Sequence, residues 1–400
     1  MEISRMSGRF LLETVIRNNT LMSNNYNTSK VFVAACAGMG FFGVAMLSLG
    51  PILGQLGDGA VSLPSTLSIG IIIGTILFGP VVDRFGYKWL TIISSILALA
   101  GLQGLANASS QTALHASIFA LGLGGGILNG LTNAVVSDIY DDSHRGGRLG
   151  VLGAFYCIGA LLWTLLNYFI EDYMIPLNAM SVVMALFIVY FFFISFPAAK
   201  PAENVGLKQT LGLLKYPALI MFAIVLFFQS GFEGASGSFS ISYLVDAHSV
   251  ERGVATLAMT WFTIGMMAGR FPLGYITSKL KDLGTLYLYL SVALIGVVIF
   301  FTMPTVVSAV YLGMALVGFG VGATYPVVLN FIGGAFRNQS GTAFSVAIFI
   351  ALLGQYTFNK LVGDSFAASN YLLFPCMLIG AVVMIMILVP VAKRISSRMK

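Results

Sequence analysis

One acidic residue stands deep inside an apolar stretch of this sequence. Glu233 lies within residues 216–242, with Gln229 one helical turn before it and Ser236 and Ser240 following at roughly helical spacing. In a helix these four side chains share one face, which we expect to look into a cavity. An ionisable group at the centre of a bilayer costs about 2.5–3.5 kcal/mol on insertion scales, so it points to function. Glu233 would exchange a proton, hydrogen-bond solute hydroxyls or balance a cation; a neutral carboxyl bonded to a neighbouring helix is the structural alternative.

Other apolar stretches carry neutral polar and aromatic side chains that are suited to hydrogen bonding. The candidate solute-binding residues are Asn129, Asn133, Tyr156, Trp163, Gln229, Glu233, Trp261, Tyr325, Asn330 and Gln355. Any one of them can instead join two helices, a contact worth about 0.6 kcal/mol on average. Together they favour a small, neutral, polar solute such as a sugar, because a strongly anionic solute would need more than one buried base.

Arg270 is a basic residue inside an apolar stretch. Counting residues from the ends of the two stretches puts Glu233 and Arg270 about 15 Å or more apart in height. We therefore expect no direct ion pair between them. We expect the Arg270 side chain to reach back to the membrane surface or to support the loop that follows.

The composition fixes the broad class of protein. Hydrophobic residues make up 58% of the chain and charged residues 9%, whereas about a quarter of the residues of a soluble domain are charged. The three cysteines show no CxxC or Cys/His spacing, and no glycine-rich phosphate loop with a lysine is present. We expect a protein of the lipid bilayer that is not an enzyme, with no cofactor, no metal and no nucleic-acid partner.

Crossing a bilayer takes about 20 apolar residues, and such stretches recur along the whole chain. They fall near 31–54, 64–82, 89–107, 114–136, 149–170, 174–196, 216–242, 253–276, 284–303, 307–331, 341–360 and 370–392. This pattern predicts an all-α membrane protein of twelve transmembrane helices.

A polar interval at the middle of the chain divides these stretches into two groups of six. We predict an N-terminal tail (1–30), a first half (31–196), a linker (197–215), a second half (216–392) and a C-terminal tail (393–400). Basic residues gather in the tails and alternate loops, so the termini are expected in the cytoplasm. We also expect the chain to be a monomer in the cell (inner) membrane. The N-terminal segment is typical of a tail rather than a signal peptide, and translation begins at Met1 or Met22.

Glycine motifs suggest that the two halves are related. Gly74–Gly79 recurs as Gly269–Gly274 at an offset of 195 residues, and Gly124–Gly126 recurs as Gly320–Gly322 at an offset of 196. A parallel repeat of six-helix halves is a known plan of transporters, with the solute site at the interface of the repeats.

The segment Gly79–Lys88 resembles the signature loop of the major facilitator superfamily. Gly79, three residues, Asp83, Arg84, one residue, Gly86, one residue and Lys88 follow the order of that loop. The resemblance implies that superfamily's twelve-helix fold in two pseudo-symmetric halves, and transport by alternating access. Asp83 would be stabilised by a facing helix N-terminus or by a base such as Arg84, and the contact would act as a latch. Ser278 takes the corresponding place in the second half, so a latch there would be weaker.

The segments 322–326 and 340–343 are similar to the fucose- and glucose-permease branch, although that branch usually has an acid in the first span and this chain has none. We predict a secondary active or facilitative transporter of a sugar-like solute, with protons as a coupling ion through Glu233. An exporter of amphipathic compounds or drugs is an alternative, favoured by 31 Phe and 18 Met and weakened by the missing arginine of the fourth span. A membrane sensor that moves nothing is the other alternative, and it would need an extra domain or a longer tail.

Overall fold

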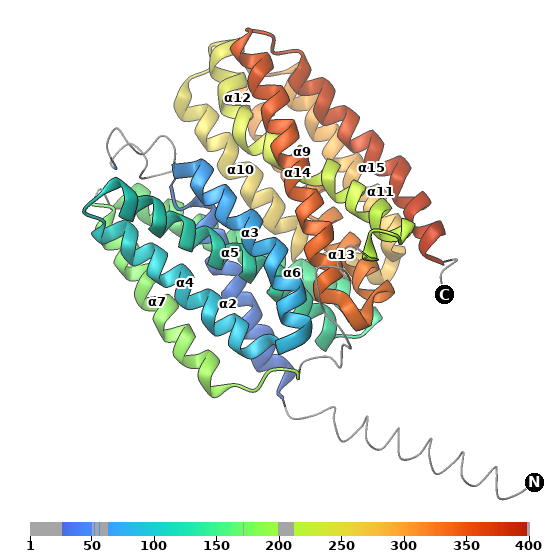
Figure 1. Ribbon diagram of the computed structural model, residues 1–400. Helices are drawn as coiled ribbons and strands as arrows, with labels where there is room; N and C mark the ends of the chain where they lie inside the picture. The colour runs from blue at the N-terminus through green and yellow to red at the C-terminus, as the bar shows by residue number, and fades with distance from the viewer. Residues whose placement is uncertain are drawn as a thin grey trace, which may run out of the picture.

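The computed structural model describes residues 26–49, 52, 56, 63–170, 172–198 and 212–397. The described chain is a bundle of helices arranged as two groups that lie side by side (Figure 1). Most of the predicted N-terminal tail and linker, and residues 398–400 of the predicted C-terminal tail, lie outside the described residues.

The first group holds the helices that precede the linker. They are α2 (Thr28–Leu47), α3 (Leu63–Phe85), α4 (Tyr87–Asn107), α5 (Gln111–Ile139), α6 (Asp142–Phe169) and α7 (Met174–Phe193).

The second group holds the helices that follow the linker, and one of its crossings is divided. They are α9 (Pro217–Ser242) with the π-helical η3 (Tyr243–Ala247), α10 (Arg252–Arg270), α11 (Leu273–Thr302), α12 (Val307–Val321), α13 (Thr324–Ala335), η4 (Arg337–Gln339), α14 (Ser340–Ala367) and α15 (Leu373–Ser397).

The described helices confirm the prediction of a twelve-helix membrane protein. Eleven segments are long and apolar enough to cross a membrane, with α12 and α13 counted as one crossing. The less apolar α10 makes the twelfth crossing. Its predicted end at residue 276 is wrong, because α10 ends at Arg270 and α11 already begins at Leu273. Pro272 lies between them, and a proline is tolerated at a helix start but not in a helix interior.

The internal repeat is visible in how glycines let helices approach one another. In the first half α3 packs on α5, and in the second half α10 packs on α12. A Cβ added to Gly74 would lie 2.4 Å from the carbonyl oxygen of Leu123, and one added to Gly269 would lie 2.5 Å from that of Phe319. The two halves therefore use the same close backbone contact at an offset of 195 residues.

The bundle has two ends, and we call the one with the start of α2 and the end of α15 the terminal end. The two halves meet along α14 against α3 and α5, and along α10, α11 and α13 against α6. Figure 1 shows α6 beside α13 at this junction. Hydrogen bonds that join the halves gather at the terminal end and at mid-depth in the bundle.

Candidate functional site

Glu233 lies in the middle of α9, partly exposed, at a junction of both halves. It is close enough to Tyr156 and Cys157 of α6 and to Arg270 of α10 to interact with them electrostatically. Tyr325 of α13 belongs to the same group. Glu233 therefore faces a first-half helix and two other second-half helices.

Most of the polar side chains predicted to form a stripe on the seventh span are buried in contacts between helices. Gln229, Ser236 and Ser240 are 0%, 1% and 1% exposed. Gln229 Nε2 donates to the carbonyl oxygen of Val321 at 3.1 Å. The expectation that this whole face looks into a cavity is wrong for these three residues, because α9 packs on α14 and α15 as well as on α10.

Neutral hydrogen-bonding groups from both halves lie close to Tyr325 and Gly234, which neighbour Glu233. Asn129 of α5 is within hydrogen-bonding reach of Tyr325, and Asn133 Nδ2 donates to the Asn129 carbonyl at 2.8 Å. Gln355 of α14 lies against Gly234, since a Cβ there would be 2.4 Å from its Cγ. The structure thus brings together Asn129, Asn133, Tyr156, Glu233, Tyr325 and Gln355 of the predicted residues.

Arg270 points into the bundle, and the expectation that it reaches the membrane surface is wrong. It is 5% exposed, and its Nη1 donates to the Gly153 carbonyl at 2.7 Å and to Cys157 Sγ at 3.5 Å. Helix side chains tilt toward the N-terminus of their helix. Since α9 and α10 run in opposite directions, Arg270 leans toward mid-depth and Glu233 leans toward the terminal end. Within the described residues the two make no ion pair, as expected.

A proline explains why Arg270 also finds a backbone partner. Pro326 has no N–H, so the carbonyl of Gly322 four residues earlier lacks its helical donor. The helix divides there into α12 and α13. Arg270 Nε donates to that Gly322 carbonyl at 3.4 Å.

The two tryptophans of the predicted site lie apart from Glu233. Trp163 is completely buried within the first half, so it offers no surface to a solute. Trp261 is 42% exposed on the same face of α10 as Leu257 and Ile264, and it stacks on Tyr311 with ring centroids 6.3 Å apart. An aromatic ring on an apolar stripe is explained by contact with lipid or by packing.

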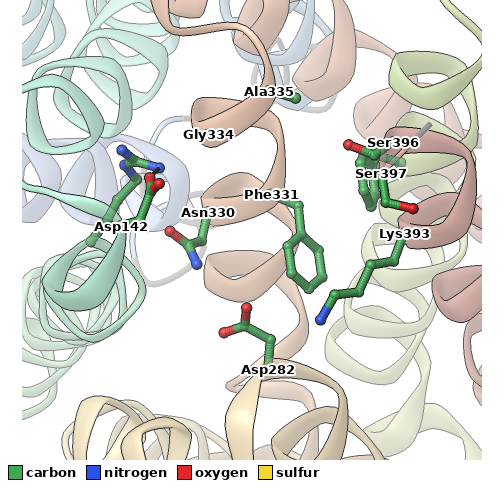
Figure 2. Close-up of a pocket in the computed structure, with 11 residues that line it drawn as sticks. Asp142, Asp282, Asn330, Phe331, Gly334, Ala335, Lys393, Ser396 and Ser397 are labelled. Atoms are coloured by element: carbon green, nitrogen blue, oxygen red, sulfur yellow. Dashed lines mark ion pairs between the residues drawn. The ribbon is translucent and has the colours of Figure 1, made fainter. Parts of the chain in front are cut away.

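Asn330 lies in a different place, at a cavity of about 260 Å³ near the terminal end. Figure 2 shows the Lys393 side chain extending toward Asp282 there, with the Asp282 carboxylate turned toward the side of Asn330 and Asp142 across the cavity. The Asp142 carboxylate is paired with Arg145 at 2.7 Å and with Arg337 at 2.9 Å. Asn330 is therefore not grouped with Glu233.

Asp83 of the Gly79–Lys88 loop joins the two halves at the terminal end. It is 2% exposed. Its Oδ2 accepts from the backbone N–H of Thr342 at 2.8 Å and from the Thr342 hydroxyl at 2.6 Å. The facing group is the N-terminus of α14, one of the two partners that the sequence suggests. Arg84 instead lies over the ring of Phe85, 5.2 Å from its centroid.

The other residues of the loop hold its shape. Gly86 has φ 80°, a left-handed conformation that favours glycine. A Cβ on Gly79 would lie 2.7 Å from the Gly341 carbonyl oxygen, so this glycine lets α3 approach α14. Lys88 Nζ donates to the Phe192 carbonyl at 2.9 Å and so ties α4 to the end of α7.

Sequence reasoning missed further contacts between the halves at this end. Asp138, near the end of α5, accepts from Ser340 Oγ at 2.8 Å and from the hydroxyl of Tyr87. No local signal pairs residues about 200 positions apart. One indication of this contact was present in the sequence, which is that Ser340 stands at the start of an apolar stretch.

The family model of the Major Facilitator Superfamily matches residues 31–357 of this chain. The chain belongs to the major facilitator superfamily. The match covers most of both halves, and it confirms the resemblance drawn from the Gly79–Lys88 loop. A superfamily member of this fold is a multi-pass transporter of the membrane and not an enzyme.

Curated relatives match only parts of this chain. Bypass of stop codon protein 6 of Saccharomyces cerevisiae is 24% identical over 236 residues, 49% of this chain and 45% of that protein. Multidrug resistance protein 3 of Bacillus subtilis is 26% identical over 133 residues, 32% of this chain and 26% of its own length. The probable plastidic glucose transporter 1 of Arabidopsis thaliana is 33% identical over 105 residues, 26% and 20% of the two chains. The chain spans less than half the length of the curated relatives it matches.

Solved structures of the superfamily match over nearly the whole chain. The E. coli fucose:proton symporter FucP superposes with a TM-score of 0.76 at 19% identity, covering 90% of this chain and 98% of that one. The proton:xylose symporter XylE gives 0.71 at 16% identity, covering 90% and 95%. The human organic anion transporter MFSD10 gives 0.76 at 13% identity, covering 90% and 99%. At these identities the likeness establishes the fold.

Proposed function

We propose that the chain is a secondary transporter that moves a small, hydroxylated, sugar-like solute by alternating access, coupled to protons through Glu233. The observation that carries the proposal is the placement of Glu233. Its partly exposed carboxyl lies at mid-depth among tyrosine hydroxyls and side-chain amides from both halves. Hydroxyl and amide groups donate and accept hydrogen bonds, which suits a solute rich in hydroxyls.

The printed names of similar proteins support the same class of solute. FucP is a fucose:proton symporter, XylE is a proton:xylose symporter, and one curated relative is a probable glucose transporter. The match to a multidrug resistance protein keeps export of amphipathic compounds as a second candidate.

The contacts at the terminal end support the two-state part of the proposal. Asp83, Asp138 and Asp142 each join the first half to residues near the start of α14. We propose that these contacts hold the terminal end closed in one state and break in the other. With the termini in the cytoplasm, as the basic loops favour, the state with a closed terminal end opens toward the opposite side of the membrane. We propose that the chain works as a monomer in the cell membrane.

Uptake into proteoliposomes tests the proposal. The purified chain is reconstituted, and accumulation of labelled glucose, fucose, xylose, amino acids and amphipathic dyes is measured with and without a pH gradient. Proton-stimulated accumulation of a sugar-like solute is expected. Movement of dyes alone would favour the exporter, and no movement of any solute would contradict the transporter proposal.

A further inference from the structure

The Arg270 guanidinium is buried and only partly satisfied. Its Nε and Nη1 atoms donate to the Gly322 and Gly153 carbonyls and to Cys157. Within the described residues, Nη2 has no hydrogen-bond acceptor, and it is not among the fully buried polar atoms that lack one. The Nη2 edge of the guanidinium therefore keeps some accessible surface, although Arg270 as a whole is only 5% exposed.

The bonds that Arg270 makes do not neutralise its charge. Carbonyl oxygens and a thiol are neutral acceptors, and in the described part of the chain no carboxylate lies within 4.0 Å of Arg270. Burying an ion without an adjacent counter-ion is unfavourable. An anion would stabilise such a cation, and the Nη2 edge is where the anion would bind.

The protonation state of Glu233 determines whether the site needs an anion to be neutral. It is the acid that interacts with Arg270 electrostatically. While Glu233 is ionised, the two residues give the site no net charge. When Glu233 takes up a proton, Arg270 leaves one positive charge in a medium of low dielectric, and a monoanion restores neutrality.

Apart from Arg270, the described groups around Glu233 include no acid or base that would be charged near neutral pH. They are Arg270 of α10, Tyr156 and Cys157 of α6, Tyr325 of α13, Asn129 of α5 beyond Tyr325, and Gln355 of α14. In this described set, the balance of charge depends on Glu233, Arg270 and the solute.

We propose that Arg270 binds a carboxylate of the transported solute, so that the solute is a hydroxylated monocarboxylate of the sugar-acid class. This inference rests on the proposed function and refines the expectation of a neutral sugar. One proton on Glu233 and one carboxylate at Arg270 bind together and leave the loaded site neutral. Since coupling between two ligands is reciprocal, the affinity for the carboxylate rises as the pH falls. A dianion such as a phosphate ester would leave a net negative charge.

Binding to the purified full-length chain tests the inference with matched pairs of probes. The pairs are D-glucuronate with D-glucose, D-galacturonate with D-galactose, and D-gluconate with sorbitol. Affinities are measured by thermal stabilisation and by isothermal calorimetry at pH 5.5 and pH 7.5. In at least one pair the acid is expected to bind about tenfold or more tightly, the range for a hydrogen bond to a charged group, with the larger preference at pH 5.5.

Variants distinguish the role of Arg270 from that of Glu233. Arg270→Gln is expected to reduce the preference for the acid to about onefold, and Arg270→Lys to retain part of it because the charge remains. Glu233→Gln is expected to keep the preference and lose its pH dependence. If Arg270→Gln does not fold, the wild-type pairs and Arg270→Lys still decide the question.

The outcomes distinguish this inference from the proposed function. If the neutral member of each pair binds as well as the acid or better, the carboxylate inference fails and sugar transport stands. An acid preference that is unchanged in Arg270→Gln overturns the role of Arg270. If no member of any pair binds and no solute of the uptake panel is taken up, the proposed function fails together with the inference.

Discussion

Asp83 at the end of α3 caps the start of α14 through Thr342, whose N–H and hydroxyl both donate to the same carboxylate oxygen. The first N–H groups of a helix lack partners within that helix, and an acid there also interacts favourably with the helix dipole. Here the capping residue comes from the other half of the protein. The cap of α14 is therefore complete only when the two halves meet at the terminal end.

Replacement of Asp83 by alanine should open the terminal end. A hydrogen bond to a charged group contributes about 1.5–3 kcal/mol, so we expect the closed population to fall about tenfold or more relative to the open one. Distances between spin labels at Phe85 and Asn338, measured by pulsed EPR in a cysteine-free background, report the change. Arg84→Ala is the matched control, because among the described residues the Arg84 guanidinium makes no hydrogen bond or ion pair and lies over the neighbouring Phe85 ring. Equal distance distributions in wild type and Asp83→Ala would contradict the latch.

Glu233→Gln should uncouple transport from protons. The variant keeps hydrogen-bonding capacity but cannot ionise, so uptake driven by a pH gradient should fall to the level seen without a gradient. Exchange of labelled for unlabelled solute should persist, since it needs no net proton movement. Asp364→Asn is a suitable control, because Asp364 is 66% exposed and pairs with Lys360 far from the site. Gradient-driven uptake that survives in Glu233→Gln would exclude proton coupling through this residue.

The glycines that join α3 to α5 should not tolerate a side chain. A Cβ added to Gly126 would lie 2.3 Å from the Ile71 carbonyl oxygen, so Gly126→Ala must push the two helices apart. We expect a loss of about 1–3 kcal/mol of stability, seen as a lower Tm in detergent. Gly380→Ala is the control within α15, where an added Cβ meets nothing within 4 Å. That change should be neutral or stabilising by up to about 1 kcal/mol.

The charge of Asp141, which caps the start of α6, should be insensitive to pH in the range where transport is assayed. Hydrogen bonds from Ser143, then from His144, lower the pKa of Asp141 to about 2. A depressed pKa gives stability that is present above the unfolded value near 3.8 and lost only as the pH falls through about 2. Asp141→Asn should therefore leave the shape of the uptake profile between pH 5 and pH 8 unchanged. A shifted midpoint in this variant would assign part of the pH dependence to the α5–α6 loop.

The fold was predictable because lipid imposes a simple rule on sequence. Each crossing needs a long apolar run, and the runs from 64–82 to 370–392 coincide with helices from α3 to α15. The repeat was visible because Gly74 and Gly269 perform the same close packing in both halves. The boundary between α10 and α11 was misplaced because its residues are apolar enough to continue a span, and only Pro272 marks the break.

The site was harder to predict because polar residues on one face of a helix do not indicate which neighbouring helices cover that face. Gln229 and Ser236 share a face with Glu233, yet neighbouring helices bury them. The predicted position of the Arg270 side chain was wrong because its height in the membrane was counted along the backbone alone. A long side chain leans toward the start of its helix, and that tilt brings Arg270 within electrostatic reach of Glu233.

The divided crossing of α12 and α13 has a mechanical consequence. Gln229 and Arg270 donate to the Val321 and Gly322 carbonyls at the break, so bending there need not sacrifice a helical hydrogen bond. The segment beyond the break carries Tyr325 and packs on α6, whereas α12 packs on α10 and α11. Since α13 also packs on α9, α11 and α14 of its own half, it contacts both halves of the bundle. We expect the break between α12 and α13 to bend when the two halves change their relative position.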